Sequence, residues 1–306
     1  MTPVKKMVLG RYELMEMVGS GGQGELFAGW DVETDQKVAI KLQKPRQFES
    51  TGHYGEIADE LAGEGGRTKH LAGIEGIPRF IECGDYQNRY CIVLEFVEGA
   101  VLYDRMISAR PMKEMSTAAA IIGQLCEILH QVHTRRLVHR DVKPENIILE
   151  PDGRVRLIDM GLAIEIGEHT ERGCGTVGYA PPEQYDENPD GVTPRADVFA
   201  LGCLLLEMTV MRLPYAGTEE RPEPECPVLP PDRLRLVPEQ IRSLALRMVD
   251  REPANRPADV LEVFDLLRPL LHCPGSNPPR KPLDPDPTEF YRTGRSTLWS
   301  LGDTAR

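Results

Sequence analysis

The sequence predicts an α+β fold in two lobes, with a five-stranded antiparallel sheet and one helix first and a mostly helical region after it. Two patterns indicate this. As far as Val97, short apolar runs alternate with turn-forming residues, which is typical of strands. After Gly99, apolar residues recur at the 3.6-residue period of a helix. The hydrophobic content of 41% over 306 residues is sufficient for a substantial core.

The first lobe is expected between residues 11 and 97. Strands are predicted at 12–18, 25–30 and 37–42, and two more within 79–96 around a turn at 85–88. A helix is predicted at 59–71, where glycines weaken the helical pattern. The expected order is therefore three strands, one helix and two strands.

The second lobe, residues 98–271, is expected to be helical. Its clearest helix is Ala118–Val132, whose apolar residues fall on one face, and further helices are predicted at 197–211, 238–249 and 258–271. From 272 to 306, prolines are frequent and apolar residues are few, so a disordered tail is predicted there.

Charge and cysteine content exclude some classes of function. The net charge of −12 argues against sequence-independent binding to nucleic acid or to an anionic membrane. The seven cysteines form no CxxC pair and no zinc-type spacing, so reduced thiols in a cytoplasmic protein are expected. The longest apolar run, Val198–Leu206, is too short for a membrane span, and residues 1–10 do not form a secretory signal.

A glycine-rich cluster separates the first two expected strands. It consists of Gly19, Ser20, Gly21, Gly22, Gln23 and Gly24, followed by Glu25 and Leu26. Glycines let backbone N–H groups approach phosphates closely. A dinucleotide-binding motif would continue into a helix, whereas a strand follows here, and no Gly-Lys-Ser/Thr closes a P-loop. By itself the cluster fits a phosphate-binding loop or a plain hairpin turn.

Two further motifs supply charged groups. Lys41 ends the apolar strand Val38–Ile40, in which the small Ala39 leaves room for a flat ring, and it follows the glycines at a distance that favours contact with α- and β-phosphates. The string His139–Asn146 follows the amphipathic helix, and Asp159 comes thirteen residues after it. These carboxylates and this amide suit a hard metal ion, with one acid free to orient a hydroxyl nucleophile.

Taken together, these motifs resemble the protein kinase family, and in particular its eukaryotic-like (Hanks-type) serine/threonine kinases, over about residues 11–271. The resemblance implies the two-lobed protein kinase fold with ATP and Mg²⁺ as cofactors. Lys41 would hold the α- and β-phosphates and Lys143 would neutralise the γ-phosphate. Asp141 would act on the substrate hydroxyl, and Asn146 and Asp159 would hold Mg²⁺.

Other landmarks of this family follow in order. By resemblance, Thr176 would contact Asp141 and Lys143, Asp197 would cap the catalytic loop, and Arg256 would pair with Glu183. The chain also departs from the family pattern. Met160 replaces the phenylalanine of Asp-Phe-Gly, and Pro181 replaces an alanine, but neither change removes a catalytic group.

The partner of Lys41 is not decided by the sequence. Glu64 lies seven residues before Leu71, as the family spacing implies, and Glu60 is a second candidate. Thr68, one turn after Glu64, is polar where the family favours an apolar residue. Between 213 and 239, seven prolines predict the loss or reduction of the helix that the family places there to dock substrates.

The resemblance also implies an adenine pocket. Its walls would be Leu26, Ala39 and Ile148, with Leu94 behind them and the backbone of Glu95 and Val97 offering hydrogen bonds. Arg140 would pair with a phosphate on the segment between Asp159 and Glu183. The best acceptor in that segment is Thr170, although nearby glutamates could supply negative charge without modification.

The sequence therefore predicts a non-specific serine/threonine protein kinase that transfers the ATP γ-phosphate to protein hydroxyls and also phosphorylates itself. A pseudokinase scaffold and a small-molecule phosphotransferase are the alternatives. The first usually lacks a lysine or a metal ligand, and the second lacks the Pro-Pro-Glu segment, whereas this chain contains all of them. The expected partners are ATP and protein substrates with Ser/Thr acceptors, without nucleic acid or a membrane span. The oligomeric state is not predicted.

Overall fold

A computed structural model describes residues 6–21, 24–45, 51–108, 112, 114–168, 174–185, 191–215 and 227–299. The chain forms two compact units. Unit 1 contains Met1–Val97 together with Asp159–Gly161, and unit 2 contains Glu98–Ile158 and Leu162–Arg306. The first unit is built on a sheet and the second is mainly helical, which agrees with the predicted α+β organisation.

Unit 1 contains an antiparallel sheet in the order β1-β2-β3-β4-β6-β5. Its strands are β1 (Met7–Val8), β2 (Tyr12–Ser20), β3 (Gly24–Asp31), β4 (Gln36–Gln43), β5 (Phe80–Tyr86) and β6 (Arg89–Glu95). The five predicted strands are all present. The sixth, β1, is only two residues long and pairs with β2, so it carries too short a pattern to be predicted from sequence.

Helix α1 (Thr51–His70) packs on this sheet through Ile57 and Leu61, both of which are buried. It begins eight residues before the predicted start at 59. Gly65 allows its close approach to the sheet, because an added Cβ would lie 3.2 Å from the side chains of both Ile92 and Phe80. One of the glycines that weakened the prediction, Gly65, therefore has a packing role in this helix.

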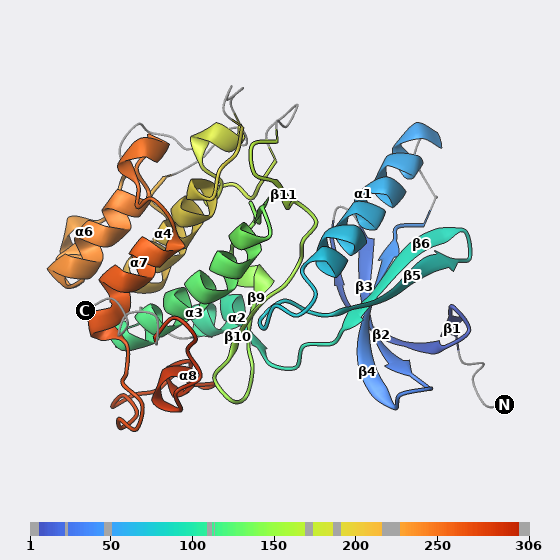
Figure 1. Cartoon of the computed structure of the whole chain (residues 1–306), viewed down its shortest axis with the longest axis horizontal. Helices are drawn as coiled ribbons and strands as arrows, with labels where there is room; N and C mark the ends of the chain where they lie inside the picture. Colours follow the sequence, from blue (N-terminus) through green and yellow to red (C-terminus); the bar gives the residue numbers. More distant parts are fainter. Residues whose placement is uncertain are drawn as a thin grey trace. The chain divides into compact units, whose positions relative to one another are not determined.

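Unit 2 is assembled around α4, which is buried along almost its whole length. Helices α3 and α6 pack against α4, and α7 packs against α3 (Figure 1). The helices are α2 (Leu102–Ser108), α3 (Met115–Thr134), α4 (Arg195–Val210), α5 (Pro231–Leu234), α6 (Glu239–Met248), α7 (Val260–Leu267) and α8 (Thr288–Arg292). The helices predicted at 118–132, 197–211, 238–249 and 258–271 correspond to α3, α4, α6 and α7.

Short strands and 3-10 turns in unit 2 hold the loops that carry the catalytic motifs. β8 (Leu137–Val138) pairs with β11 (Ile164–Glu165), and β9 (Ile147–Leu149) lies between β7 (Ala100–Val101) and β10 (Val155–Leu157). The 3-10 turns are η1 (Pro144–Asn146), η2 (Pro182–Gln184), η3 (Pro253–Asn255) and η4 (Arg268–Leu270). The loop between β8 and β9 is therefore fixed at both ends by strand pairing.

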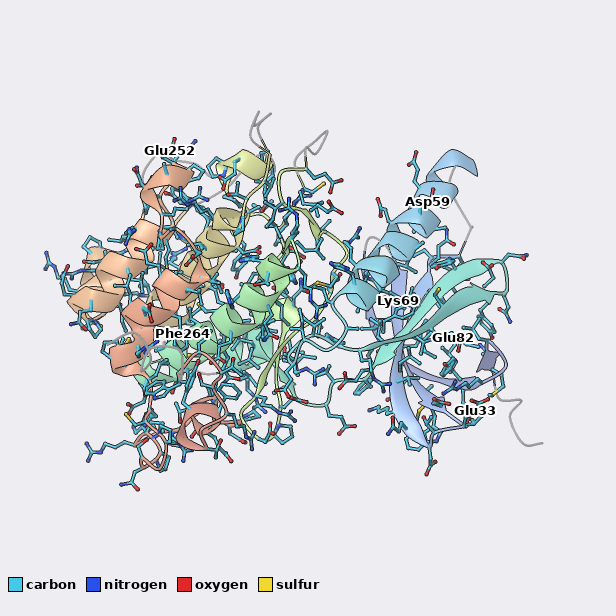
Figure 2. The ribbon with its side chains drawn as sticks, in the orientation of Figure 1. Glu33, Asp59, Lys69, Glu82, Glu252 and Phe264 are labelled. Carbon is cyan, nitrogen blue, oxygen red and sulfur yellow. The ribbon has the colours of Figure 1, made fainter. Side chains whose placement is uncertain are left out.

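The structure contradicts the disordered tail predicted from residue 272, as far as residue 299. This segment, hereafter the C-terminal strap (residues 272–299), contains α8 and packs against α3. Tyr291 and Leu298 are buried, and the ring of Tyr291 lies 6.4 Å from that of Phe264 on α7, which Figure 2 labels. Proline content predicted disorder here, but a few aromatic and apolar anchors are sufficient to order the segment.

Between 213 and 239, the described residues contain one helical turn, α5. Residues 216–226 of that segment lie outside the described part of the chain. Among the described residues, no helix is both long enough and apolar enough to cross a membrane.

Candidate active site

In unit 1, Lys41 lies between two carboxylates. Its Nζ is 2.6 Å from Glu64 Oε2 and 3.5 Å from Asp159 Oδ1. Glu64 is buried, whereas Glu60 is exposed, so Glu64 is the glutamate that pairs with the lysine. Burial lowers the pKa of Lys41, but the nearby Glu64 and Asp159 carboxylates outweigh this effect and raise it above its ordinary value. Lys41 therefore stays charged at neutral pH.

Thr68, the polar residue that departs from the family pattern, finds a hydrogen-bond partner within the helix turn that carries Glu64. Thr68 is buried, and its hydroxyl donates to the carbonyl oxygen of Glu64 at 2.8 Å. This local bond removes the cost of burying an unpaired hydroxyl. The threonine is therefore compatible with a buried position beside the ion pair.

The described part of the glycine cluster forms the turn between β2 and β3. Gly21 N donates to Gly24 O at 2.9 Å. An added Cβ at Gly24 would lie 2.5 Å from the carbonyl oxygen of Leu42, so only glycine fits where β3 approaches β4. Gly22 and Gln23 lie outside the described residues. Gly19 and Ser20 end β2, and Leu26 pairs with Lys41 across the sheet.

The residues expected around adenine differ in burial from their core neighbours. On β4, Val38 and Ile40 are fully buried, while Ala39 and Lys41, which face the other side, are half-buried. The other expected residues are also half-buried: Leu26, Leu94, Glu95 and Val97 in unit 1, and Ile148 in unit 2. The backbone N–H of Glu95 already donates to Arg79 O, so the predicted contact at Glu95 rests on its carbonyl oxygen.

In unit 2, the other candidate catalytic residues surround the carboxylate of Asp141. Asp141 Oδ2 lies 2.7 Å from Lys143 Nζ and accepts from Asn146 Nδ2 at 2.9 Å. Thr176 donates to Asp141 Oδ1 at 2.6 Å and accepts from Lys143 at 2.7 Å. All four residues were selected from the sequence, and the structure brings them together. The Thr176 contacts are those that the family resemblance implied.

A buried aspartate holds the loop that carries this cluster. Asp197 on α4 accepts from the backbone N–H groups of His139 (2.9 Å) and Arg140 (2.8 Å) and lies 2.8 Å from His133 Nε2. Burial alone would raise the pKa of Asp197, but its bonds to His133 and His139 lower it below its usual value. His133 was not selected from the sequence, where its place in the last turn of α3 was the available signal.

The end of the 174–185 segment is fixed by a second buried ion pair. Arg256, whose side chain is fully buried, donates to Glu183 at 2.5 and 2.9 Å. It also donates to the carbonyl oxygens of Asp250, Arg195 and Arg251. This is the pair that the resemblance implied, and Pro181 immediately precedes its 3-10 turn, η2.

The donor groups proposed for a metal are all oxygens. Asn146 uses its Nδ2 group on Asp141, which leaves its amide oxygen to face a cation, and the side chain of Asp159 is 38% exposed. Among the described residues, no group of three or more His, Cys, Asp or Glu could form a metal cage. Mg²⁺ needs no such cage, since one or two protein oxygens together with phosphates commonly hold it.

The turn that carries Asp159 is held by a residue that sequence reasoning missed. Arg67 on α1 donates through Nε to Met160 O (2.9 Å) and through Nη2 to Gly161 O (2.6 Å). Met160 itself is buried, as expected for an apolar replacement of phenylalanine. The available signal was a basic residue three positions after Glu64 on the same helix. Thr170, the predicted phosphate acceptor, lies outside the described residues.

Comparison with known proteins identifies the family of this chain. Residues 12–265 match the protein kinase domain. The chain is 28% identical over 286 residues to serine/threonine-protein kinase pkn2 of Myxococcus xanthus, a match that covers 87% of this chain and 33% of that protein. It is 26% identical over 282 residues to serine/threonine-protein kinase PrkC of Bacillus subtilis (86% of this chain, 42% of that protein).

A third relative, serine/threonine-protein kinase PknB of Mycobacterium leprae, is 28% identical over 287 residues (89% of this chain, 44% of that protein). The chain thus spans less than half the length of these curated relatives. The family match covers most of the chain and includes the residues around Lys41 and those around Asp141. On this evidence, the chain belongs to the protein kinase family and has its two-lobed fold.

Proposed function

We propose that this chain is a serine/threonine protein kinase that uses ATP and Mg²⁺. The observation that carries the proposal is the cluster around Asp141, in which Lys143, Asn146 and Thr176 all contact one carboxylate. The three relatives described above, each named as a serine/threonine-protein kinase, support the choice of substrate class. The expected protein substrates, self-phosphorylation and a cytoplasmic location belong to the same proposal.

Each charged group would have a separate task in phosphoryl transfer. Asp141 would orient the acceptor hydroxyl and take its proton. The hydrogen bond that the Thr176 hydroxyl donates to the same carboxylate supports this role. Lys143 would offset charge on the γ-phosphate. Lys41, kept charged by Glu64, would hold the α- and β-phosphates. Little covalent chemistry is required, because positioning and charge stabilisation lower most of the barrier.

The oxygens of Asn146 and Asp159 would hold Mg²⁺, which when bound neutralises phosphate charge. The glycine cluster would supply backbone N–H groups to the phosphates. Ala39 and Leu26, both half-buried, would contact the adenine ring. These assignments extend the family resemblance to individual residues of this chain.

The test is a transfer assay with labelled ATP, Mg²⁺ and a generic basic protein. Asp141→Asn is expected to lower turnover by roughly 10²- to 10⁴-fold while nucleotide affinity is kept, because only general-base help is lost. Asp159→Ala is expected instead to abolish Mg²⁺-dependent nucleotide binding. Asp265→Asn is the matched control, since that carboxylate is exposed and pairs with Arg268, away from the groups proposed for the nucleotide.

Label on the basic protein would support a protein kinase, and label on the chain itself would support self-phosphorylation. Mass spectrometry would then show whether Thr170 is the modified residue, with Asp141→Asn as the inactive reference. Nucleotide binding without transfer to any protein would favour a scaffold. Wild-type turnover in both Asp141→Asn and Asp159→Ala would overturn the proposal.

A further inference from the structure

Arg67 and Glu64 lie three residues apart on α1, so their side chains project from the same face of the helix. Glu64 contacts Lys41, and Arg67 contacts the backbone on either side of the Met160–Gly161 peptide bond. All of these residues belong to unit 1. One helical turn therefore holds both the lysine and the turn that contains Asp159.

The turn held by Arg67 has a demanding backbone geometry. Asp159 has a φ of 71°, in the left-handed region that few non-glycine residues adopt. Its Oδ1 accepts from Gly161 N at 2.9 Å and also faces Lys41. A strained conformation of this kind persists only where neighbouring groups hold it. Arg67 is placed to do so, because it bonds the two residues that follow Asp159.

The guanidinium group suits this task better than a single charge would. Its Nε and Nη2 donors form a rigid fork that bonds two successive carbonyl oxygens at 2.9 and 2.6 Å. The contacts also close a ring. Lys41 bonds Glu64, α1 joins Glu64 to Arg67, Arg67 bonds the turn, and the turn returns through Asp159 to Lys41.

We propose that Arg67 is a positioning residue that fixes the carboxylate of Asp159 for Mg²⁺-dependent nucleotide binding. This inference rests on the proposed function, since it assigns Arg67 to the same site. Arg67 itself would touch neither nucleotide nor metal. Its effect would reach them through the Met160 and Gly161 carbonyls.

The effect of Arg67 on the Asp159 turn must be distinguished from its effect on the stability of helix α1. A basic residue in the last turn of a helix also stabilises the helix dipole, and α1 has Arg67, Lys69 and His70 there. Lys69, labelled in Figure 2, is exposed on the same turn. Lys69→Met is therefore the matched control for Arg67→Met, since both substitutions remove one positive charge and keep a flexible apolar stem.

The experiment measures nucleotide affinity by calorimetric titration with and without Mg²⁺, together with turnover and melting temperature. In Arg67→Met, affinity without Mg²⁺ is expected to stay within about twofold of wild type. The gain in affinity that Mg²⁺ provides is expected to fall by about tenfold or more, as for the loss of one charge-assisted hydrogen bond. Lys69→Met is expected to keep the full gain.

An unchanged Mg²⁺-dependent gain in folded Arg67→Met would overturn the proposal, and so would an equal loss in Lys69→Met. If Arg67→Met does not fold, Arg67→Lys provides the same comparison, because a lysine keeps the charge but loses the two-donor fork. Its Mg²⁺-dependent gain must then lie below that of wild type. The binding readout also separates the two proposals, since it reports on Arg67 even if the wild-type chain transfers no phosphate.

Discussion

The carboxylate of Asp141 accepts a bond from each neighbouring group that sequence reasoning placed near it. Asn146 and Lys143 face one oxygen, and the Thr176 hydroxyl bonds the other. A carboxylate with this many donors has little rotational freedom. Its orientation is therefore fixed, as the general-base role proposed for it requires.

Arg256 is expected to contribute strongly to the unfolding free energy of unit 2. Replacing it with Met is expected to cost about 3–5 kcal/mol of unfolding free energy, because Glu183 would remain buried without its partner. The measurement is urea unfolding followed by the fluorescence of Trp299 in a Trp30→Phe background. The chain has only two tryptophans, so this background leaves a single reporter in unit 2.

Arg268→Met provides the control for Arg256. Arg268 forms a pair with Asp265, whose side chain is 66% exposed, and its guanidinium lies 5.5 Å from the centre of the Phe264 ring. An exposed pair contributes about 1 kcal/mol or less, and such a contact with an aromatic ring contributes about as much. If Arg256→Met lost no more stability than Arg268→Met, the Glu183 pair would not be the support that its burial indicates.

Among the elements, the C-terminal strap is the least expected. Glu127 on α3 accepts from the Ser296 hydroxyl and from both the backbone and the hydroxyl of Thr297. Gln124, one turn earlier, donates to Pro287 O in the strap and to Gly153 O. An added Cβ at Gly123 would lie 2.5 Å from the Tyr291 hydroxyl, so a glycine on α3 makes room for the aromatic anchor.

Truncation after Leu271 is therefore expected to destabilise unit 2 by at least about 3 kcal/mol. Tyr291 and Leu298 are both buried, and each buried side chain of this kind contributes about 1.5–3 kcal/mol. Urea unfolding followed by far-UV circular dichroism measures the loss. A chain that ends at Trp299, and so keeps the whole strap, is the reference for this comparison. Equal midpoints for the two truncations would show that the strap is dispensable.

Some elements of this fold follow from the pattern of apolar residues in their own sequence, and others do not. Strands β2 to β6 of unit 1 and helix α3 follow the alternation or period of their own apolar residues, so they were predicted closely. The strap was not, because its anchors are few and widely spaced in a proline-rich segment. Their partners, Glu127 and Phe264, are distant in sequence. Composition carries no information about the surface on which the strap packs.

The contacts of the candidate site differ in the same way. Asp141, Lys143 and Asn146 fall within one contiguous motif, so their proximity followed from the sequence. The bond between Arg67 and Met160 joins residues 93 positions apart, and no local pattern predicts it. The choice between Glu64 and Glu60 likewise required the burial of Glu64 against the sheet. Sequence therefore identified the chemical groups better than the contacts that position them.

The two units divide the groups assigned to the nucleotide. Unit 1 contains the glycine cluster, Lys41 and Asp159, and unit 2 contains Lys143 and Asn146. Each unit also contains one tryptophan, Trp30 on β3 and Trp299 in the strap. On the assignments proposed above, nucleotide binding is expected to stabilise each unit against unfolding.

This prediction is tested with Trp30→Phe and Trp299→Phe, each of which leaves one reporter. A non-hydrolysable ATP analogue with Mg²⁺, at a hundredfold excess over its Kd, is expected to add about 2.7 kcal/mol to the unfolding free energy seen by each reporter. Asp159→Ala in both backgrounds is expected to lose the Mg²⁺-dependent part of that increase. Stabilisation seen at Trp30 alone would mean that nucleotide binding depends on unit 1 and that Lys143 and Asn146 contribute nothing to it. Both variants are measured with the same analogue at the same concentrations. A weakly binding analogue would therefore lower the stabilisation at both reporters, and it would not produce stabilisation at Trp30 alone.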